Sequence, residues 1–149
     1  MGLVDDLRGC RVCLDTAPFI YYIERHTRYF PHVQPVFEAI DAHEIEALTS
    51  TITLLEVLVH PLRKGHNDIA TQYREILLGA SGLTTYEISH GISEQAAELR
   101  AQYSLKTPDA IQVAVGMQYD AEKLLTNDTH IQRIPEITIV TLDDYLPPN

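Results

Sequence analysis

Short apolar segments alternate with longer segments of helical periodicity along this chain. The apolar segments cover residues 11–14, 47–49, 83–86, 123–125 and 138–141, and each has the length of a strand. Between them, apolar residues recur at the three- and four-residue spacing of amphipathic helices. This alternation predicts βαβ units, and hence an α/β fold in which helices cover both faces of a mostly parallel sheet.

Capping residues and prolines predict where the helices begin and end. Helix starts are expected at Thr16 with Pro18, Pro35 in a first turn, Ser50 with Thr51, Asn67, Ser93, and Thr107 with Pro108. Pro61 is expected to end the third of these helices, and Gly79 or Gly82 the fourth. The segment 110–117 is apolar on nearly every side, which predicts a central, buried helix.

The composition suits one domain. The chain has 149 residues, of which 45% are hydrophobic, and its turn residues are scattered rather than gathered in a linker. We therefore expect a single domain over residues 1–149. The 21 acidic and 11 basic residues give a net charge of −10, which argues against general coating of nucleic acids because the chain as a whole repels polyanions.

The N-terminus and the cysteines indicate the compartment. Asp5 and Asp6 lie where a signal peptide needs positive charge, and no apolar stretch approaches the roughly 20 residues that span a bilayer. We therefore expect a cytoplasmic protein with no membrane partner. The extended residues of a predicted strand hold Cys10 and Cys13 too far apart for a disulfide, so we interpret them as free thiols in a reducing compartment.

Several common catalytic motifs are missing. The sequence contains no GxGxxG, no phosphate loop ending in Gly-Lys-Ser/Thr, no GxSxG and no HExxH, and its histidines do not cluster at metal-ligand spacing. Nucleotide binding, serine hydrolysis and zinc proteolysis therefore lose their usual sequence support. The remaining candidates for chemistry are acidic residues in unusual positions.

Three aspartates lie at the ends of predicted elements. Asp15 directly follows a predicted strand and Asp128 comes shortly after another, at the carboxyl edge where open α/β sheets bind ligands. Asp109 lies in the first turn of the predicted buried helix. Taken singly, each has an ordinary alternative, which is a helix N-cap for Asp15 and Asp128 and a favourable helix-dipole interaction for Asp109.

Glu56 lies on a narrow polar line of an otherwise apolar helix, together with Thr53 and His60. One interpretation is a glutamate on the only solvated stripe of the helix, and the other is a functional carboxylate that a cation compensates. If the strands before Asp15 and Asp128 are neighbours, all four acids can converge at one end of the sheet. Converging carboxylates favour a Mg²⁺ or Mn²⁺ site, and such sites commonly hydrolyse phosphodiesters.

Four segments resemble, in order, the acidic motifs of PIN-domain ribonucleases, with the closest likeness to VapC-type toxins of toxin–antitoxin modules. They are VCLDTAPFIYYIE (12–24), TSTITLLEV (49–57), LKTPDAIQVA (105–114) and LLTND (124–128), and the resemblance extends from residue 11 to residue 142. It implies a single PIN-like domain with a five-stranded parallel sheet. It also implies a metal-dependent ribonuclease with Mg²⁺ or Mn²⁺ at the catalytic residues Asp15, Glu56, Asp109 and Asp128, usually a homodimer bound by an antitoxin.

Two positions depart from the pattern of the family. Ala17 stands where many members have Ser or Asn, and Asn127 replaces a basic residue that often precedes the last aspartate. All four acids are present, so neither change argues for an inactive enzyme. Thr126 matches a hydroxyl that the family places near the metal, where it would support a ligand rather than be one.

Two other functions remain open. A phosphoryl-accepting receiver domain also has an acidic pocket, but it needs a pair of acids after the first strand and a lysine after the last. Here residues 16–18 are Thr-Ala-Pro, and no lysine follows Lys123. A PIN fold kept as a non-catalytic RNA- or protein-binding module would be expected to have lost at least one acid.

Aromatic and basic residues suggest contact surfaces. Five aromatic residues lie between Phe19 and Phe30, which predicts either a surface for self-association and a protein partner or ordinary core packing. Basic residues near the acidic motifs are candidates to line an approach for the RNA backbone, or else are ordinary solvated side chains. They are Arg25, Arg28, Arg63, Lys64 and Lys106.

Overall fold

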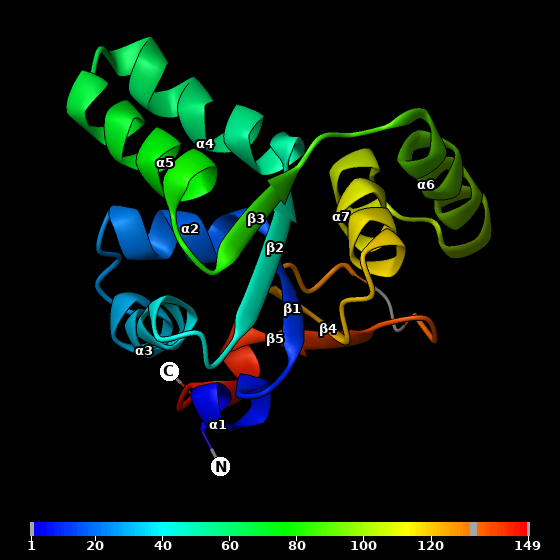
Figure 1. Ribbon diagram of the computed structural model, residues 1–149, viewed down its shortest axis with the longest axis horizontal. Coiled ribbons are helices and arrows are strands. Elements are labelled where there is room, and N and C mark those ends of the chain that lie inside the picture. The colour runs from blue at the N-terminus through cyan, green and yellow to red at the C-terminus, as the bar shows by residue number, and fades with distance from the viewer. Residues whose placement is uncertain (1, 132–133, 149) are drawn as a thin grey trace.

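The five predicted strands form one parallel sheet in the computed structural model, which describes residues 2–131 and 134–148 (Figure 1). They are β1 (Arg11–Leu14), β2 (Glu46–Ser50), β3 (Leu83–Tyr86), β4 (Lys123–Thr126) and β5 (Thr138–Thr141). The strand order is β3-β2-β1-β4-β5, and every neighbouring pair is parallel. The predicted α/β fold with a five-stranded sheet is confirmed.

Helices occupy the connections between these strands. They are α1 (Leu3–Leu7), α2 (Thr16–Ile23), α3 (Phe30–Asp41), α4 (Thr51–Lys64), α5 (Asn67–Gly79), α6 (His90–Tyr103), α7 (Thr107–Gln118) and the 3₁₀ helix η1 (Leu142–Tyr145). The sequence did not indicate α1 or η1, because elements this short show no clear periodicity. None of the described helices is long and apolar enough to cross a bilayer.

Side chains that alternate along the strands supply a hydrophobic core on each face of the sheet. Val12 and Leu14 of β1 pack with residues of α1, α2, α3 and α5, whereas Cys13 between them packs with α6 and α7. In β4, Leu125 and Leu124 divide between the two cores in the same way. The strands are therefore apolar on both sides, as expected of a parallel sheet that helices cover.

Two prolines occupy positions that differ from the prediction. Pro35 does not lie in a first turn, because α3 begins earlier, with Pro31 in its first turn and Pro35 in its interior. Pro61 does not end α4, which continues to a cap at Gly65 with φ of 72°. Pro61 removes one backbone hydrogen bond, but only the last turn of the helix follows it and the residue is buried, so packing compensates for the loss.

The other helix starts are mostly confirmed. The starts predicted at Thr16, Ser50–Thr51, Asn67 and Thr107 match α2, α4, α5 and α7. Ser93 is wrong as a start, because α6 already begins after Ser89, whose hydroxyl accepts a hydrogen bond from the Ile92 N–H at 3.2 Å. The predicted central helix is α7, and it is buried along most of its length.

The chain crosses from one side of β1 to the other between β3 and β4. The strands β2 and β3 lie on one side of β1, and β4 and β5 lie on the other. At such a switch point the loops after the neighbouring strands separate, which leaves room for a ligand beyond their carboxyl ends. Asp15 follows β1 and Asp128 lies just beyond β4, so both belong to this edge. Helix α4 leaves β2 at the same edge, whereas α1 and the chain ends lie at the opposite one (Figure 1).

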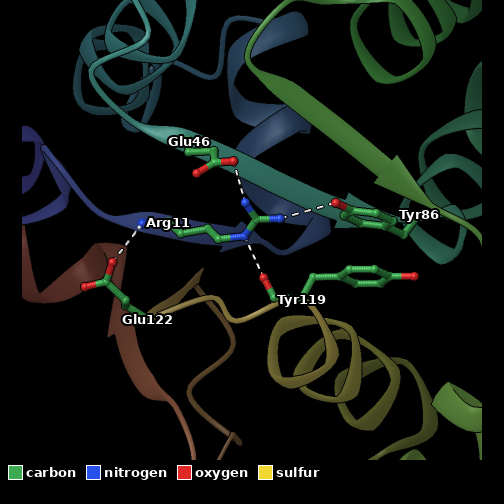
Figure 2. A network of polar contacts seen from close by, with 5 residues as sticks. All are labelled: Arg11, Glu46, Tyr86, Tyr119 and Glu122. Carbon is green, nitrogen blue, oxygen red and sulfur yellow. Dashed lines mark hydrogen bonds and ion pairs between the residues drawn. The ribbon is translucent and has the colours of Figure 1, made fainter.

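Arg11 organises the opposite edge, at the start of β1 (Figure 2). Its guanidinium donates to the Tyr119 carbonyl at 2.6 Å and to the Tyr86 hydroxyl at 3.2 Å, and it pairs with Glu46. The backbone N–H of Arg11 donates to the Glu122 carboxylate at 3.2 Å. The rings of Tyr86 and Tyr119 stack with their centroids 3.5 Å apart. These contacts fix β1 to β2, to β3 and to the end of α7.

Candidate active site

Asp15 ends β1 and caps α2. Its carboxyl group is buried, with Oδ1 accepting from the Thr16 N–H at 2.8 Å and Oδ2 accepting from the Thr126 hydroxyl at 2.7 Å. Burial raises the pKa of Asp15, the charge of Asp128 raises it further, and these hydrogen bonds offset only part of the rise. The N-cap role accounts for one oxygen of Asp15 but not for the buried second oxygen.

Asp109 and Asp128 each affect the pKa of the other. Asp109 is 7% exposed in the first turn of α7. Burial raises the pKa of Asp109 to about 7, with further contributions from Asp128 and from the charge of Asp15, while Lys106 acts in the opposite direction. Burial would also raise the pKa of Asp128, but the His130 N–H at 2.8 Å and Asp109 stabilise the charged form, and the pKa is lowered. Without a metal, Asp109 is thus the acid of this pair that holds its proton to the higher pH.

Glu56 is connected to this group through Thr16. The Thr16 hydroxyl donates to the Glu56 carboxylate at 2.6 Å, while the Thr16 N–H donates to Asp15. The polar line of α4 faces the protein at its start, where Thr53 is fully buried and Glu56 half-buried, and it reaches solvent only at His60. The polar line is therefore not simply the solvated side of α4.

The apolar side of α4 is exposed instead. On this side, Leu55, Val59 and Leu62 are 59%, 43% and 50% exposed. Their spacing places them along one side of the helix. The aromatic segment near α2 behaves differently, because Phe19 is fully buried and the Tyr22 ring stacks on Phe37 with centroids 4.2 Å apart. Core packing accounts for Phe19 and Tyr22, and an exposed apolar surface lies on α4.

An apolar groove lies away from the acids. It has a volume of about 350 Å³ between α2, α3 and α5, and Tyr22, Ile76 and Leu83 are among its lining residues. None of the four acids lines this groove. The chemistry of the acidic residues and the apolar groove are thus separate features of the molecule.

Buried hydroxyl and amide groups surround the acids. The Thr126 hydroxyl, which the sequence placed near the metal, donates to Asp15 and accepts from the Asp128 N–H at 3.0 Å. Gln112 was not predicted, although it is fully buried and donates to the Thr53 hydroxyl at 2.6 Å. A glutamine within an otherwise apolar helix, three residues after Asp109, was the available sequence signal.

The structure shows the surroundings of the two residues that depart from the family pattern. Asn127 donates through Nδ2 to the Tyr21 hydroxyl at 3.2 Å and accepts from the Asp143 N–H at 3.1 Å, so it joins α2 to η1. Ala17 contributes no polar group, and the hydroxyl that contacts an acid in this stretch belongs to Thr16.

Two of the five basic residues that could line an approach for RNA lie over aromatic rings. The guanidinium of Arg25 lies over the Phe30 ring at 5.1 Å, and that of Arg28 lies over the Tyr29 ring at 5.7 Å. The two basic residues at the end of α4 are exposed, and Lys106 is close enough to Asp109 to affect its pKa. Of the five predicted basic residues, Lys106 is therefore the one that the structure places beside an acid.

The structure brings Asp15, Asp109 and Asp128 together and connects Glu56 to them through Thr16. Among the residues that the structure describes, no three His, Cys, Asp or Glu side chains form a ready-made group of metal ligands. The donor set nevertheless fits a hard divalent cation. It consists of carboxylates, which Mg²⁺ and Mn²⁺ prefer, and their mutual repulsion is what such an ion would relieve.

Comparisons with known proteins agree with this fold. Residues 12–137 match the family model described as PIN domain. A toxin–antitoxin complex from Klebsiella pneumoniae contains a chain 28% identical to this one, with a TM-score of 0.65 over 88% of this chain and 97% of that chain. A search of the curated proteins found no match.

Two more distant structures share the fold. VapBC2 from Rickettsia felis, bound to a DNA fragment from its promoter, is 18% identical with a TM-score of 0.68, over 87% of this chain and 97% of that chain. VapC20 from Mycobacterium tuberculosis, described as a sarcin–ricin loop cleaving toxin, is 16% identical with a TM-score of 0.66, over 80% and 91%. The resemblance inferred from the four acidic motifs is confirmed.

Proposed function

The chain belongs to the PIN domain family, and from that premise we propose that it is a Mg²⁺- or Mn²⁺-dependent endoribonuclease acting through its four carboxylates. The observation that supports this most is the crowding of Asp15, Asp109 and Asp128 at the switch point of the sheet, which contributes to the raised pKa of Asp109. One similar protein is described as cleaving the sarcin–ricin loop, so RNA is the first substrate class to test.

Asp15, Asp109 and Asp128 would hold the metal ion, with Glu56 held near them by Thr16. A bound divalent ion supplies charge stabilisation for the phosphate and lowers the pKa of an attacking water. Asp109 gives up its proton when the ion binds, because a cation removes the repulsion that raised its pKa. Thr126 keeps the Asp15 carboxylate oriented through its hydrogen bond.

RNA must approach a chain whose net charge is −10. The metal would neutralise part of the acidic cluster, and exposed Arg63 and Lys64 on the helix that contains Glu56 add positive charge. Lys106, beside Asp109, adds more. We expect these side chains to contact phosphates, which position a nucleic acid without selecting its sequence.

We also propose that the chain is the toxin of a toxin–antitoxin pair and forms a homodimer. The similar structures are toxin–antitoxin complexes, and one of them is 28% identical to this chain. Leu55, Val59 and Leu62 expose an apolar stripe on α4, and a contiguous apolar patch of this kind commonly marks a protein interface. We assign this stripe to the second copy of the chain.

Cleavage of RNA by the purified protein tests the nuclease. Labelled transfer RNA and ribosomal RNA are incubated with the protein in Mg²⁺, in Mn²⁺ or in EDTA. We expect cleavage only with a metal ion, and we expect Asp15→Asn to abolish it because this change removes a ligand charge. Glu98→Gln, which alters an exposed carboxylate on α6, is the matched control and should cleave normally.

The alternatives give different results. Cleavage in EDTA, or full activity of Asp15→Asn, would contradict the metal mechanism. Transfer of phosphate from acetyl phosphate to Asp15 would instead favour a phosphoryl-accepting domain. Binding of RNA without cleavage in either metal would favour a non-catalytic module.

A further inference from the structure

Gln112 is a polar side chain in an unusual place. It is 0% exposed on α7, and it follows Asp109 by three residues, so the two lie on the same side of the helix. Most of its neighbours on α7 are buried apolar residues. Burying an amide is costly unless its donors and acceptor are paired, so the contacts of Gln112 require an explanation.

The amide of Gln112 contacts two other elements. Its Oε1 accepts from the Ser50 hydroxyl at 3.1 Å, and Ser50 ends β2. Its Nε2 donates to the Thr53 hydroxyl at 2.6 Å, in the first turn of α4. Gln112 therefore links α7 to β2 and to α4, the helix that contains Glu56.

The link from Gln112 to Glu56 passes through hydroxyl groups. The Thr53 hydroxyl lies 3.3 Å from the Thr16 hydroxyl, which donates to Glu56 at 2.6 Å. The Thr53 hydroxyl also lies 2.9 Å from the Thr49 hydroxyl. Because the Thr53 oxygen accepts from Gln112, its own proton remains available for a neighbouring threonine.

The orientation of the Thr49 hydroxyl, at the other end of these hydrogen bonds, is also fixed. The Thr49 hydroxyl uses its proton on the Leu14 carbonyl at 2.8 Å, so it can only accept from Thr53. No buried side-chain polar atom in the described part of the chain lacks a partner. The Thr53 hydroxyl therefore accepts from Gln112 and has its single proton left for Thr16 or Thr49.

We propose that Gln112 is a positioning residue, which orients Glu56 through Thr53 and Thr16 so that this carboxylate can bind a divalent ion. The proposal rests on the proposed metal-dependent function of the same site. Gln112 does not contact the substrate in this role. Its effect is to connect the acid-bearing helices α7 and α4 through a short path of hydrogen bonds.

Binding of Mn²⁺ without RNA tests this role. The free Mn²⁺ concentration is followed by electron paramagnetic resonance during titration of wild type, Gln112→Met and Val113→Ala. Methionine is similar in length but cannot replace the amide hydrogen bonds, whereas Val113→Ala loosens the same helix at a fully buried position outside the polar network. Thermal unfolding of the metal-free proteins measures how much each variant is destabilised.

We expect Gln112→Met to weaken Mn²⁺ binding by about 10- to 100-fold, the usual effect of removing a group that orients a ligand. Val113→Ala should bind Mn²⁺ as wild type does, even where its melting temperature falls as far. Thr53→Val keeps the shape of the side chain but breaks the path from Gln112 to Glu56, so it should also weaken Mn²⁺ binding. If Gln112→Met does not fold, Thr53→Val decides the question, and wild-type Mn²⁺ affinity would overturn the proposal.

Two negative results can be told apart. If wild type and Gln112→Met bind Mn²⁺ equally and cleave RNA equally, the positioning role is wrong and the nuclease stands. If wild type neither binds Mn²⁺ nor cleaves RNA, the proposed function itself is wrong, and the role of Gln112 is overturned with it.

Discussion

Replacing Asp109 with asparagine should stabilise the metal-free protein near neutral pH. Asp109 is 7% exposed, and burial beside Asp128 and Asp15 raises its pKa from 3.8 to about 7. Asparagine keeps the shape, and its amide can donate a hydrogen bond as a protonated carboxyl group can. The substitution therefore removes a charge that the folded protein resists.

The size and the pH range follow from this pKa. Below pH 4 Asp109 is protonated in both the folded and the unfolded states, so the raised pKa costs nothing. Between about pH 4 and 7 the unfolded chain releases the proton while the folded protein keeps it, so wild-type stability falls as the pH rises. The full difference is at most about 4 kcal/mol above pH 7, and relaxation of the site will lower it. The Asp109→Asn variant does not have this pH-dependent loss of stability at residue 109. Asp15 is present in both proteins, so its contribution to the pH dependence of stability is common to both.

Urea unfolding in EDTA, at several values from pH 5 to pH 8, measures the effect. We expect the free energy of unfolding of Asp109→Asn to exceed that of wild type by an amount that grows with pH. Millimolar Mn²⁺ should then stabilise wild type more than the variant, because an ion that binds only the folded state adds its binding free energy. Glu98→Gln controls for the loss of one negative charge.

The ordinary helix-dipole role of Asp109 predicts the opposite sign. A carboxylate that only interacts with the start of α7 contributes about 0.3–1 kcal/mol, so Asp109→Asn would be less stable by that amount with or without metal. If the free energy of unfolding depends on pH equally in the two proteins, or if Mn²⁺ stabilises them equally, Asp109 does not belong to the site and the reasoning is refuted.

Three further substitutions test the surroundings of the site and the scaffold. Thr126→Val should destabilise the protein by about 1–3 kcal/mol in urea unfolding and weaken Mn²⁺ binding, because Asp15 loses a hydrogen bond and the Asp128 N–H loses its acceptor; an unchanged protein would contradict this. Gly82→Ala should cost more than about 1 kcal/mol, since φ is +85° and the new Cβ would lie 2.5 Å from the Ile40 carbonyl oxygen, whereas Gly79→Ala has open space and should be tolerated. Leu62→Glu should lower self-association in analytical ultracentrifugation, while Leu78→Glu on α5 should not, and equal effects would argue against the α4 stripe as the dimer surface.

The strands and three of the four acids were predictable because they follow local rules. A short apolar run bounded by turn residues has few structural alternatives to a strand, and an acid shortly after a parallel strand must lie at the carboxyl edge. Asp15 and Asp128 satisfy that condition, and Asp109 follows Thr107 and Pro108, a strong helix start. Which strands would be neighbours was not local information, and the convergence of the acids depended on it.

The orientation of α4 and the role of Gln112 could not be derived from periodicity alone. The wide apolar side of α4 predicts a buried face, but in this chain Leu55 and Leu62 are exposed and Thr53 is buried. The position of the acid site decides this, because Glu56 must turn toward Thr16. The partners of the Gln112 amide come from β2 and α4, so its environment depends on the tertiary structure.

The residues that break the ordinary rules of burial gather at one edge of the sheet. Asp109 and Gln112 are polar and buried, Leu55 is apolar and exposed, and all three belong to the helices that flank the switch point. At the other edge, Arg11 keeps its charge paired with Glu46 at the boundary with solvent, as a structural residue does. A buried acid whose pKa is raised to about 7 lowers the stability of the folded protein near neutral pH. The presence of such a group beside two more acids, with a buried amide network next to them, favours a function for this edge over a purely structural one.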